Sequence, residues 1–136
     1  MPEPKKVIFV DDDPAYQRLV RRVCAKLPQV GEIIEALDGA QALAIVQQAA
    51  SGEREMPDVA FVDVNMPVLD GFGFLEGLRD MATAYPSVTQ ISPVVMMSSS
   101  DEARDKERAS QLGAGDFVVK PNSLAEIGES IRRVLA

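Results

Sequence analysis

Carboxylates follow two of the apolar runs of this sequence, at the points where buried strands would end. Asp11, Asp12 and Asp13 follow one run, and Asp63 follows another. A turn or helix-cap role explains any single Asp, and we assign Asp13 to that role. The same explanation fails for the other three together, because like charges ~4 Å apart repel by about 1 kcal/mol in water and by about 4 kcal/mol at an effective dielectric of 20. We therefore expect a cation among them.

A hydroxyl and an ammonium follow two further apolar runs. Ser98 ends the run that starts at Val94, and Lys120 follows the run that starts at Phe117. In an open parallel sheet the C-terminal ends of the strands share one edge, and ligands bind there at the point where the strand order reverses. We therefore expect the carboxylates, the hydroxyl and the ammonium to converge on one small site.

The available ligand atoms favour a hard divalent cation. The chain has no His and a single Cys, Cys24, which excludes imidazole ligands, Cys clusters, Ser-His-Asp catalysis and phosphohistidine carriage. Mg²⁺, or Mn²⁺, takes one or two carboxylates together with a phosphate oxygen. An Asp carboxylate can attack phosphorus and form an acyl phosphate once the metal and a fixed cation neutralise the phosphoryl oxygens. Lys120 would be that cation.

Five short apolar runs must position these groups. Their lack of polar alternation predicts that most of them are strands covered on both faces, as in a parallel sheet. The runs are Val7–Val10, Glu32–Ala36, Val59–Val62, Val94–Met97 and Phe117–Val119.

Helix-length segments follow each run, which predicts an α/β layered domain with right-handed crossovers. The first segment starts at Pro14 and extends to Leu27, the second follows Asp38-Gly39, and the third follows Asp70-Gly71. The fourth runs from Asp101 to Leu112 with Gly113 as the C-cap, and the fifth runs from Leu124 to Leu135. In the third segment, Gly73 and Gly77 each lower the stability of the helix by on the order of 1 kcal/mol relative to Ala. We therefore expect that helix to be short or mobile.

Composition sets the remaining limits. The 136 residues are 46% hydrophobic and suffice for one domain over residues 1–136. With 14 Lys and Arg against 21 Asp and Glu, the net charge of −7 disfavours direct binding to nucleic acid or to an anionic membrane. The sequence contains neither a membrane-length apolar stretch nor a signal-peptide pattern, so we expect a cytoplasmic protein.

Four segments together resemble the receiver domain of two-component response regulators. They are Val10-Asp-Asp-Asp-Pro14, Asp63-Val-Asn-Met-Pro-Val-Leu-Asp-Gly71, Pro93-Val-Val-Met-Met-Ser98 and Gly113-Ala-Gly-Asp-Phe-Val-Val-Lys-Pro121. The match extends from Lys6 to the last helix. The resemblance implies a flavodoxin-like fold, a doubly wound five-stranded parallel sheet in the order 2-1-3-4-5 with five helices. It also implies a stand-alone receiver similar to the chemotaxis regulators, with no output domain in this chain.

The resemblance also implies roles for the groups at the strand ends. Asp63 resembles the phosphoacceptor, and Lys120 resembles the lysine that pairs with the acceptor carboxylate and then with phosphate. Asp11 and Asp12 resemble the acidic pair that holds Mg²⁺, with Asp63 and the backbone carbonyl of Asn65 completing the protein ligands. Mn²⁺ is the alternative ion.

Further positions of the family are carried over in the same way. Ser98 and Phe117 resemble the switch pair: the hydroxyl moves toward the new phosphoryl oxygens and the ring turns inward, which repacks the surface around it. The alternative for Phe117 is that it is an ordinary core residue of its strand. Asn65 and Ser100 occupy positions that tune the hydrolysis of the acyl phosphate, and Pro121 follows a cis bond in the family.

The implied partners are proteins. A sensor histidine kinase or a histidine phosphotransfer protein would donate the phosphoryl group, and a downstream protein target would recognise the switched surface. The chain would catalyse its own phosphoryl transfer and its own slow dephosphorylation, as a monomer or a phosphorylation-dependent dimer.

Three other functions share parts of this pattern. An FMN-binding flavodoxin-like protein needs hydroxyls and amides after the first strand, where Asp11 and Asp12 would repel phosphate. A Mg²⁺-dependent phosphatase usually carries a second Asp two residues after its nucleophile, and this chain has Asn65 there. A receiver-shaped module that is never phosphorylated lacks support, because each acceptor, metal and lysine position is filled.

Overall fold

The computed structural model describes residues 3–99 and 102–136. Within these ranges one parallel sheet forms in the order β2-β1-β3-β4-β5, which confirms the predicted order. The strands are β1 (Lys5–Val10), β2 (Val30–Ala36), β3 (Val59–Asp63), β4 (Val94–Ser98) and β5 (Asp116–Val119). Every predicted run lies inside one of them.

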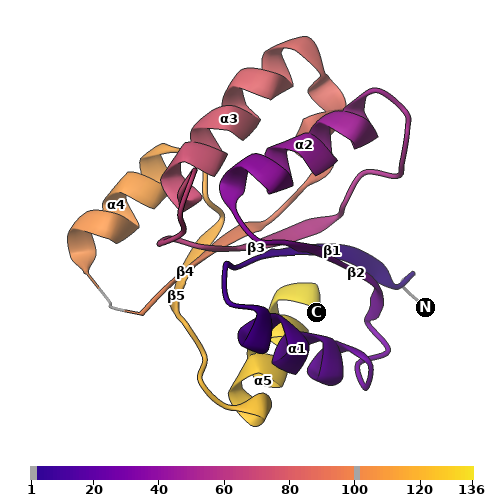
Figure 1. Cartoon of the computed structure of the whole chain (residues 1–136), viewed down its shortest axis with the longest axis vertical. Helices are drawn as coiled ribbons and strands as arrows, with labels where there is room; N and C mark the ends of the chain where they lie inside the picture. Colours follow the sequence, from indigo (N-terminus) through magenta and orange to yellow (C-terminus); the bar gives the residue numbers. More distant parts are fainter. Residues whose placement is uncertain (1–2, 100–101) are drawn as a thin grey trace.

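Helices cover both faces of this sheet (Figure 1). One face carries α1 (Pro14–Cys24) and α5 (Leu124–Leu135), and the other carries α2 (Gly39–Ala50), α3 (Gly71–Ala84) and α4 (Ala103–Gln111). A 3₁₀ helix, η1 (Pro86–Gln90), follows α3. The doubly wound arrangement and the five predicted α-helices are therefore present in the described residues. None of the helices in these ranges has the length and apolar character needed to span a bilayer.

Burial differs between the central and the edge strands. β3 and β4 are buried along their whole length, and β1 is buried from Val7 onward. Most of the strands are therefore covered on both faces, as predicted, whereas the edge strand β5 is half-buried and Val119 is 51% exposed. An edge strand has a neighbour on one side only, so less of its surface is covered.

Capping side chains begin four of the helices. The N-caps Asp13, Asp38, Asp70 and Ser123 accept hydrogen bonds from the first-turn N–H groups of Ala15, Gln41, Gly73 and Glu126. These bonds satisfy N–H donors that have no partner within the helix. The predicted capping role of Asp13 is confirmed. The C-cap of α4 is Leu112, one position before the predicted Gly113, which has the φ of +97° typical of the residue just past a helix end.

The third helix is not short. α3 has 14 residues and is the longest helix in the described ranges. A Cβ on Gly77 would lie 2.4 Å from Cδ1 of Leu43 in α2, so the glycine lets that leucine pack directly onto the α3 backbone. Burial of Phe74, Leu75 and Leu78 adds to this packing. Tertiary contact therefore outweighs the propensity cost from which we predicted a short helix.

Two smaller expectations also change, and two others fall outside the described residues. α1 ends at Cys24, before Leu27, although Leu27 is buried. The Ser92–Pro93 bond is cis, whereas the bond before Pro121 is not among the cis bonds of the described residues. The predicted start of the fourth helix at Asp101 and the predicted tuning residue Ser100 lie outside the described residues.

Candidate functional site

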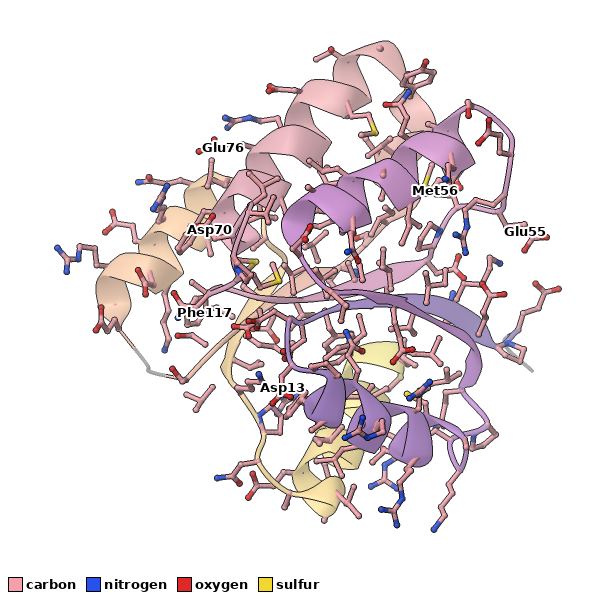
Figure 2. All side chains as sticks on the ribbon, viewed as in Figure 1. Asp13, Glu55, Met56, Asp70, Glu76 and Phe117 are labelled. Atoms are coloured by element: carbon pink, nitrogen blue, oxygen red, sulfur yellow. The ribbon has the colours of Figure 1, made fainter. Side chains whose placement is uncertain are left out.

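Strand register places the predicted site residues at one edge of the sheet. Val10 of β1 pairs with Val62 of β3, so Asp11 and Asp63 each follow a residue of that pair. Figure 2 shows the helix caps Asp13 and Asp70 toward this end of the molecule, with Glu55 at the opposite end.

The other half of the same edge is built by β4 and β5. Ser98 pairs with Val119, and the N–H of Lys120 donates to the Ser98 carbonyl at 2.7 Å. The carboxylates, the hydroxyl and the ammonium therefore meet because four parallel strands end at nearly the same level.

Three carboxylates cluster at this edge. Each of Asp11, Asp12 and Asp63 offers an oxygen, and these oxygens all lie within 4.8 Å of one another. Asp11 has no exposed surface, Asp63 is 7% exposed, and Asp12 is open to solvent. A cation arriving from solvent would therefore meet Asp12 first and the two buried carboxylates behind it.

Backbone N–H groups orient the two buried carboxylates. Oδ1 of Asp11 accepts from the N–H of Asp13 at 2.9 Å, and Oδ1 of Asp63 accepts from the N–H of Asn65 at 3.1 Å. Each bond holds one oxygen of the carboxylate. The Oδ2 atoms both face Lys120.

The Lys120 ammonium lies between these two carboxylates. Its Nζ is 2.6 Å from Oδ2 of Asp11 and 3.3 Å from Oδ2 of Asp63. Burial alone lowers the pKa of Lys120, but the hydrogen bond to Asp11 and the charges of Asp11 and Asp63 outweigh it and raise that pKa. Lys120 is therefore a fixed cation.

One ammonium does not balance this cluster. Burial raises the pKa of the Asp11 carboxyl, and the Lys120 ammonium and the Asp13 N–H offset that effect only in part. The nearby charge of Asp63 raises the pKa of Asp11 further. An oxygen-only ligand set that combines two buried carboxylates and one exposed carboxylate with a single ammonium suits a small hard cation such as Mg²⁺.

The predicted switch residues lie on β4 and β5, the two strands that build the other half of the site edge. Ser98 is buried at the end of β4, one position past Met97, which pairs with Asp63. Phe117 lies on β5, is half-buried, and packs against the core on the α2–α4 side of the sheet (Figure 2). Both side chains are thus within the elements that border the acidic site.

Two residues of α1 contact the site in ways that sequence reasoning missed. Nε2 of the buried Gln17 donates to the carbonyls of Phe9, Asp11 and Ala36 at 3.0, 3.2 and 3.1 Å. Tyr16 donates from Oη to the Pro121 carbonyl at 2.6 Å, and its ring centroid is 4.2 Å from Nζ of Lys120. Both residues are buried on α1, and no local pattern in the sequence marks either polar contact.

Fold and site together define a class of protein. It is a doubly wound α/β domain with an acidic, oxygen-only site where the strand order reverses, between β1 and β3. The family model of the response regulator receiver domain matches residues 7–132, so this chain belongs to the receiver family. The resemblance seen in the sequence is confirmed.

Individual relatives agree with this assignment. The transcriptional regulatory protein PhoP of Bacillus subtilis, for alkaline phosphatase synthesis, is 31% identical over 132 residues, which cover 96% of this chain and 48% of PhoP. The chemotaxis response regulator CheY4 of Vibrio cholerae is 29% identical, with a TM-score of 0.77 and coverage of 96% and 98%. The Mn²⁺-bound form of response regulator Rcp1 is 26% identical, with a TM-score of 0.77 and coverage of 96% and 91%. The chain spans about half the length of the curated relatives it matches.

Proposed function

We propose that this chain is a phosphorylation-controlled binding switch that accepts a phosphoryl group on Asp63 in a Mg²⁺-dependent reaction. Receiver domains are phosphorylated by histidine kinases or phosphotransfer proteins and bind Mg²⁺ or Mn²⁺ at an acidic pocket. The observation that carries the proposal for this chain is the convergence of Asp63, Asp11 and Lys120 at 2.6–3.3 Å. We also propose that residues 1–136 form one receiver domain.

The donor set suits the metal. Asp11, Asp12, Asp63 and the backbone carbonyl of Asn65 would hold Mg²⁺, and Mn²⁺ is an alternative because a related regulator, Rcp1, has a Mn²⁺-bound form. When bound, the ion supplies charge neutralisation on the phosphoryl oxygens. The burial of Asp11 next to a second carboxylate, Asp63, supports this assignment.

The chain's own residues supply the rest of the chemistry. A carboxylate oxygen of Asp63 attacks phosphorus in line with the bond to the donor's imidazole nitrogen, and the imidazole leaves. The backbone N–H of Asn65 holds the other oxygen of that carboxylate, and Lys120 neutralises charge on the transferred group. Ser98 and Phe117 then respond to the new dianion and alter the surface that a downstream protein target recognises.

The test is an intact-mass measurement after incubation with acetyl phosphate and Mg²⁺. Wild type should gain one acid-stable, base-labile phosphoryl group, and Asp63→Ala should gain none. Asp80→Ala, which removes an exposed carboxylate on α3 outside the site, is the matched control and should label like wild type. Absence of label on wild type would reject Asp63 as the acceptor, and full labelling in the presence of a chelator would reject the metal role.

A further inference from the structure

Lys120 has a third neighbour besides its two carboxylates. The ring of Tyr16 lies with its centroid 4.2 Å from Nζ, so the ammonium faces Asp11, Asp63 and an aromatic ring. A cation this close to a ring is attracted by the negative charge on the ring's face, and the attraction grows when water is excluded. Tyr16 is 9% exposed and Lys120 is half-buried, so much of this contact is shielded from water.

The same tyrosine holds the backbone that follows Lys120. Its Oη donates to the Pro121 carbonyl at 2.6 Å, and this bond joins α1 to the segment between β5 and α5. Phe9 of β1 supports the ring from the core, with ring centroids 6.1 Å apart. One side chain therefore restrains both ends of the lysine: its ammonium through the ring and its main chain through the hydroxyl.

The two carboxylates differ as partners for Lys120. Its shorter contact, 2.6 Å, is to Asp11, which is also a proposed metal ligand, and the contact to the proposed acceptor Asp63 is 3.3 Å. When Asp11 serves another cation, Lys120 loses its closest partner. The neutral ring of Tyr16 does not compete for the metal, so it keeps the ammonium beside Asp63.

We propose that Tyr16 is a positioning residue for Lys120: it holds the ammonium in reach of the Asp63 carboxylate by ring contact and by its hydrogen bond to Pro121. The proposal rests on the proposed phosphoryl transfer to Asp63. It predicts that loss of the ring slows phosphoryl transfer at saturating Mg²⁺ while leaving Mg²⁺ affinity almost unchanged, because none of the proposed metal ligands is touched.

Three variants separate the contributions. Tyr16→Leu removes ring and hydroxyl, Tyr16→Phe keeps the ring, and Tyr85→Leu removes the chain's other tyrosine, which lies at the end of α3 away from the site. The labelling rate with acetyl phosphate should fall roughly 3- to 30-fold in Tyr16→Leu, as expected for loss of a partly desolvated cation–π contact. Tyr16→Phe should fall less, and Tyr85→Leu should match wild type. Thermal unfolding identifies any variant that fails to fold, and Tyr16→Phe then carries the test.

A second measurement does not depend on phosphorylation. Acetylation of Lys120 by N-hydroxysulfosuccinimide acetate at saturating Mg²⁺ is measured by peptide mass spectrometry, with exposed Lys26 as the internal reference. Tyr16→Leu should raise the Lys120-to-Lys26 ratio several-fold. A purely structural role for Tyr16 would leave this ratio at its wild-type value in any folded variant.

A double-mutant cycle tests whether Tyr16 acts through Lys120. In a Lys120→Met background, Tyr16→Leu should cause no further loss of the residual labelling rate. An undiminished loss in that background, or wild-type labelling and acetylation in Tyr16→Leu, would overturn the proposal while leaving the function of Asp63 intact. Absence of label on wild type would instead reject the proposed function, and the acetylation ratio alone would then decide whether Tyr16 holds Lys120.

Discussion

At the scale of single residues, Asp11 lies in an environment that disfavours an ionised carboxylate. It has no exposed surface, it lies beside Asp63, and its net pKa shift is upward despite the ion pair with Lys120. A carboxyl whose pKa is raised on folding contributes stability at pH values below its unfolded pKa of about 3.9 and loses it as the pH rises through the folded value. At neutral pH, ionised Asp11 therefore lowers the stability of the metal-free protein.

This environment makes a prediction for Asp11→Asn. Without Mg²⁺, the variant should unfold at a higher temperature than wild type at pH 7, with a gain on the order of 1 kcal/mol, and the gain should vanish as the pH falls below the unfolded pKa. The amide still offers Oδ1 to the Asp13 N–H, and Lys120 keeps Asp63. Thermal unfolding across pH, with and without Mg²⁺, checks this.

Added Mg²⁺ gives a second comparison between wild type and Asp11→Asn in the same unfolding measurements. Added Mg²⁺ should raise the unfolding temperature of wild type through preferential binding to the folded state, and it should raise that of Asp11→Asn much less. An Asp11→Asn protein that is less stable than wild type without metal would contradict the inference that burial of the Asp11 carboxylate costs stability.

At the scale of elements, the site depends on how closely α3 begins behind β3. Gly71 opens α3, and a Cβ there would lie 2.6 Å from the Asp63 carbonyl oxygen and 3.0 Å from Cα of Val64. These are backbone atoms, which cannot rotate away as a side-chain end can. The absence of a side chain at Gly71 therefore sets the distance between the start of α3 and the strand end that carries Asp63.

Gly71→Ala tests that dependence. We expect a loss of roughly 1–3 kcal/mol of stability, typical of overpacking, together with slower labelling of Asp63, since the end of β3 must shift to admit the methyl group. Gly128→Ala in α5 is the matched control, because its Cβ would be 3.4 Å from a side-chain carbon of Val23 and helix propensity favours Ala. Chemical denaturation and intact-mass labelling measure both effects; equal stability of the two variants would contradict the steric argument.

At the scale of the whole molecule, Cys24 reports how often the α1–α5 layer opens. It lies at the end of α1, is 5% exposed, and packs with the core on that side of the sheet. Burial raises the pKa of its thiol to about 11. The thiolate is the reactive form, so at pH 8 only about a thousandth of the folded protein carries a reactive sulfur, even before access is considered.

We therefore expect iodoacetamide to modify Cys24 slowly in the folded protein and rapidly in denaturant. The proposed Mg²⁺ site exists only in the native state, so Mg²⁺ should slow the modification further where the reaction proceeds through global unfolding. Mass spectrometry over time at pH 8 measures this. Modification of the folded protein at the denatured rate would contradict the buried position of the thiol.

The sequence alone determined which residues end the strands and begin the helices. Apolar runs bounded by turn residues marked all five strands, and Asp13 before Pro14 marked a helix start, because these features depend on neighbours along the chain. The site residues Asp11, Asp63, Ser98 and Lys120 followed from their places at strand ends. Gly73 and Gly77 led to the wrong prediction of a short third helix, because helix propensity carries no information about Leu43, which packs against this helix from α2.

Only the tertiary structure determined the distances between the side chains of the site. Lys120 lies 57 positions after Asp63, and its closer approach to Asp11 follows from strand register and from burial of the pair, which no local pattern encodes. The contact of Tyr16 with Lys120 and Pro121 likewise arises where α1 lies against the segment between β5 and α5. Local sequence sets backbone conformation and residue type. Electrostatic contacts between distant segments form only when the helices pack against the sheet.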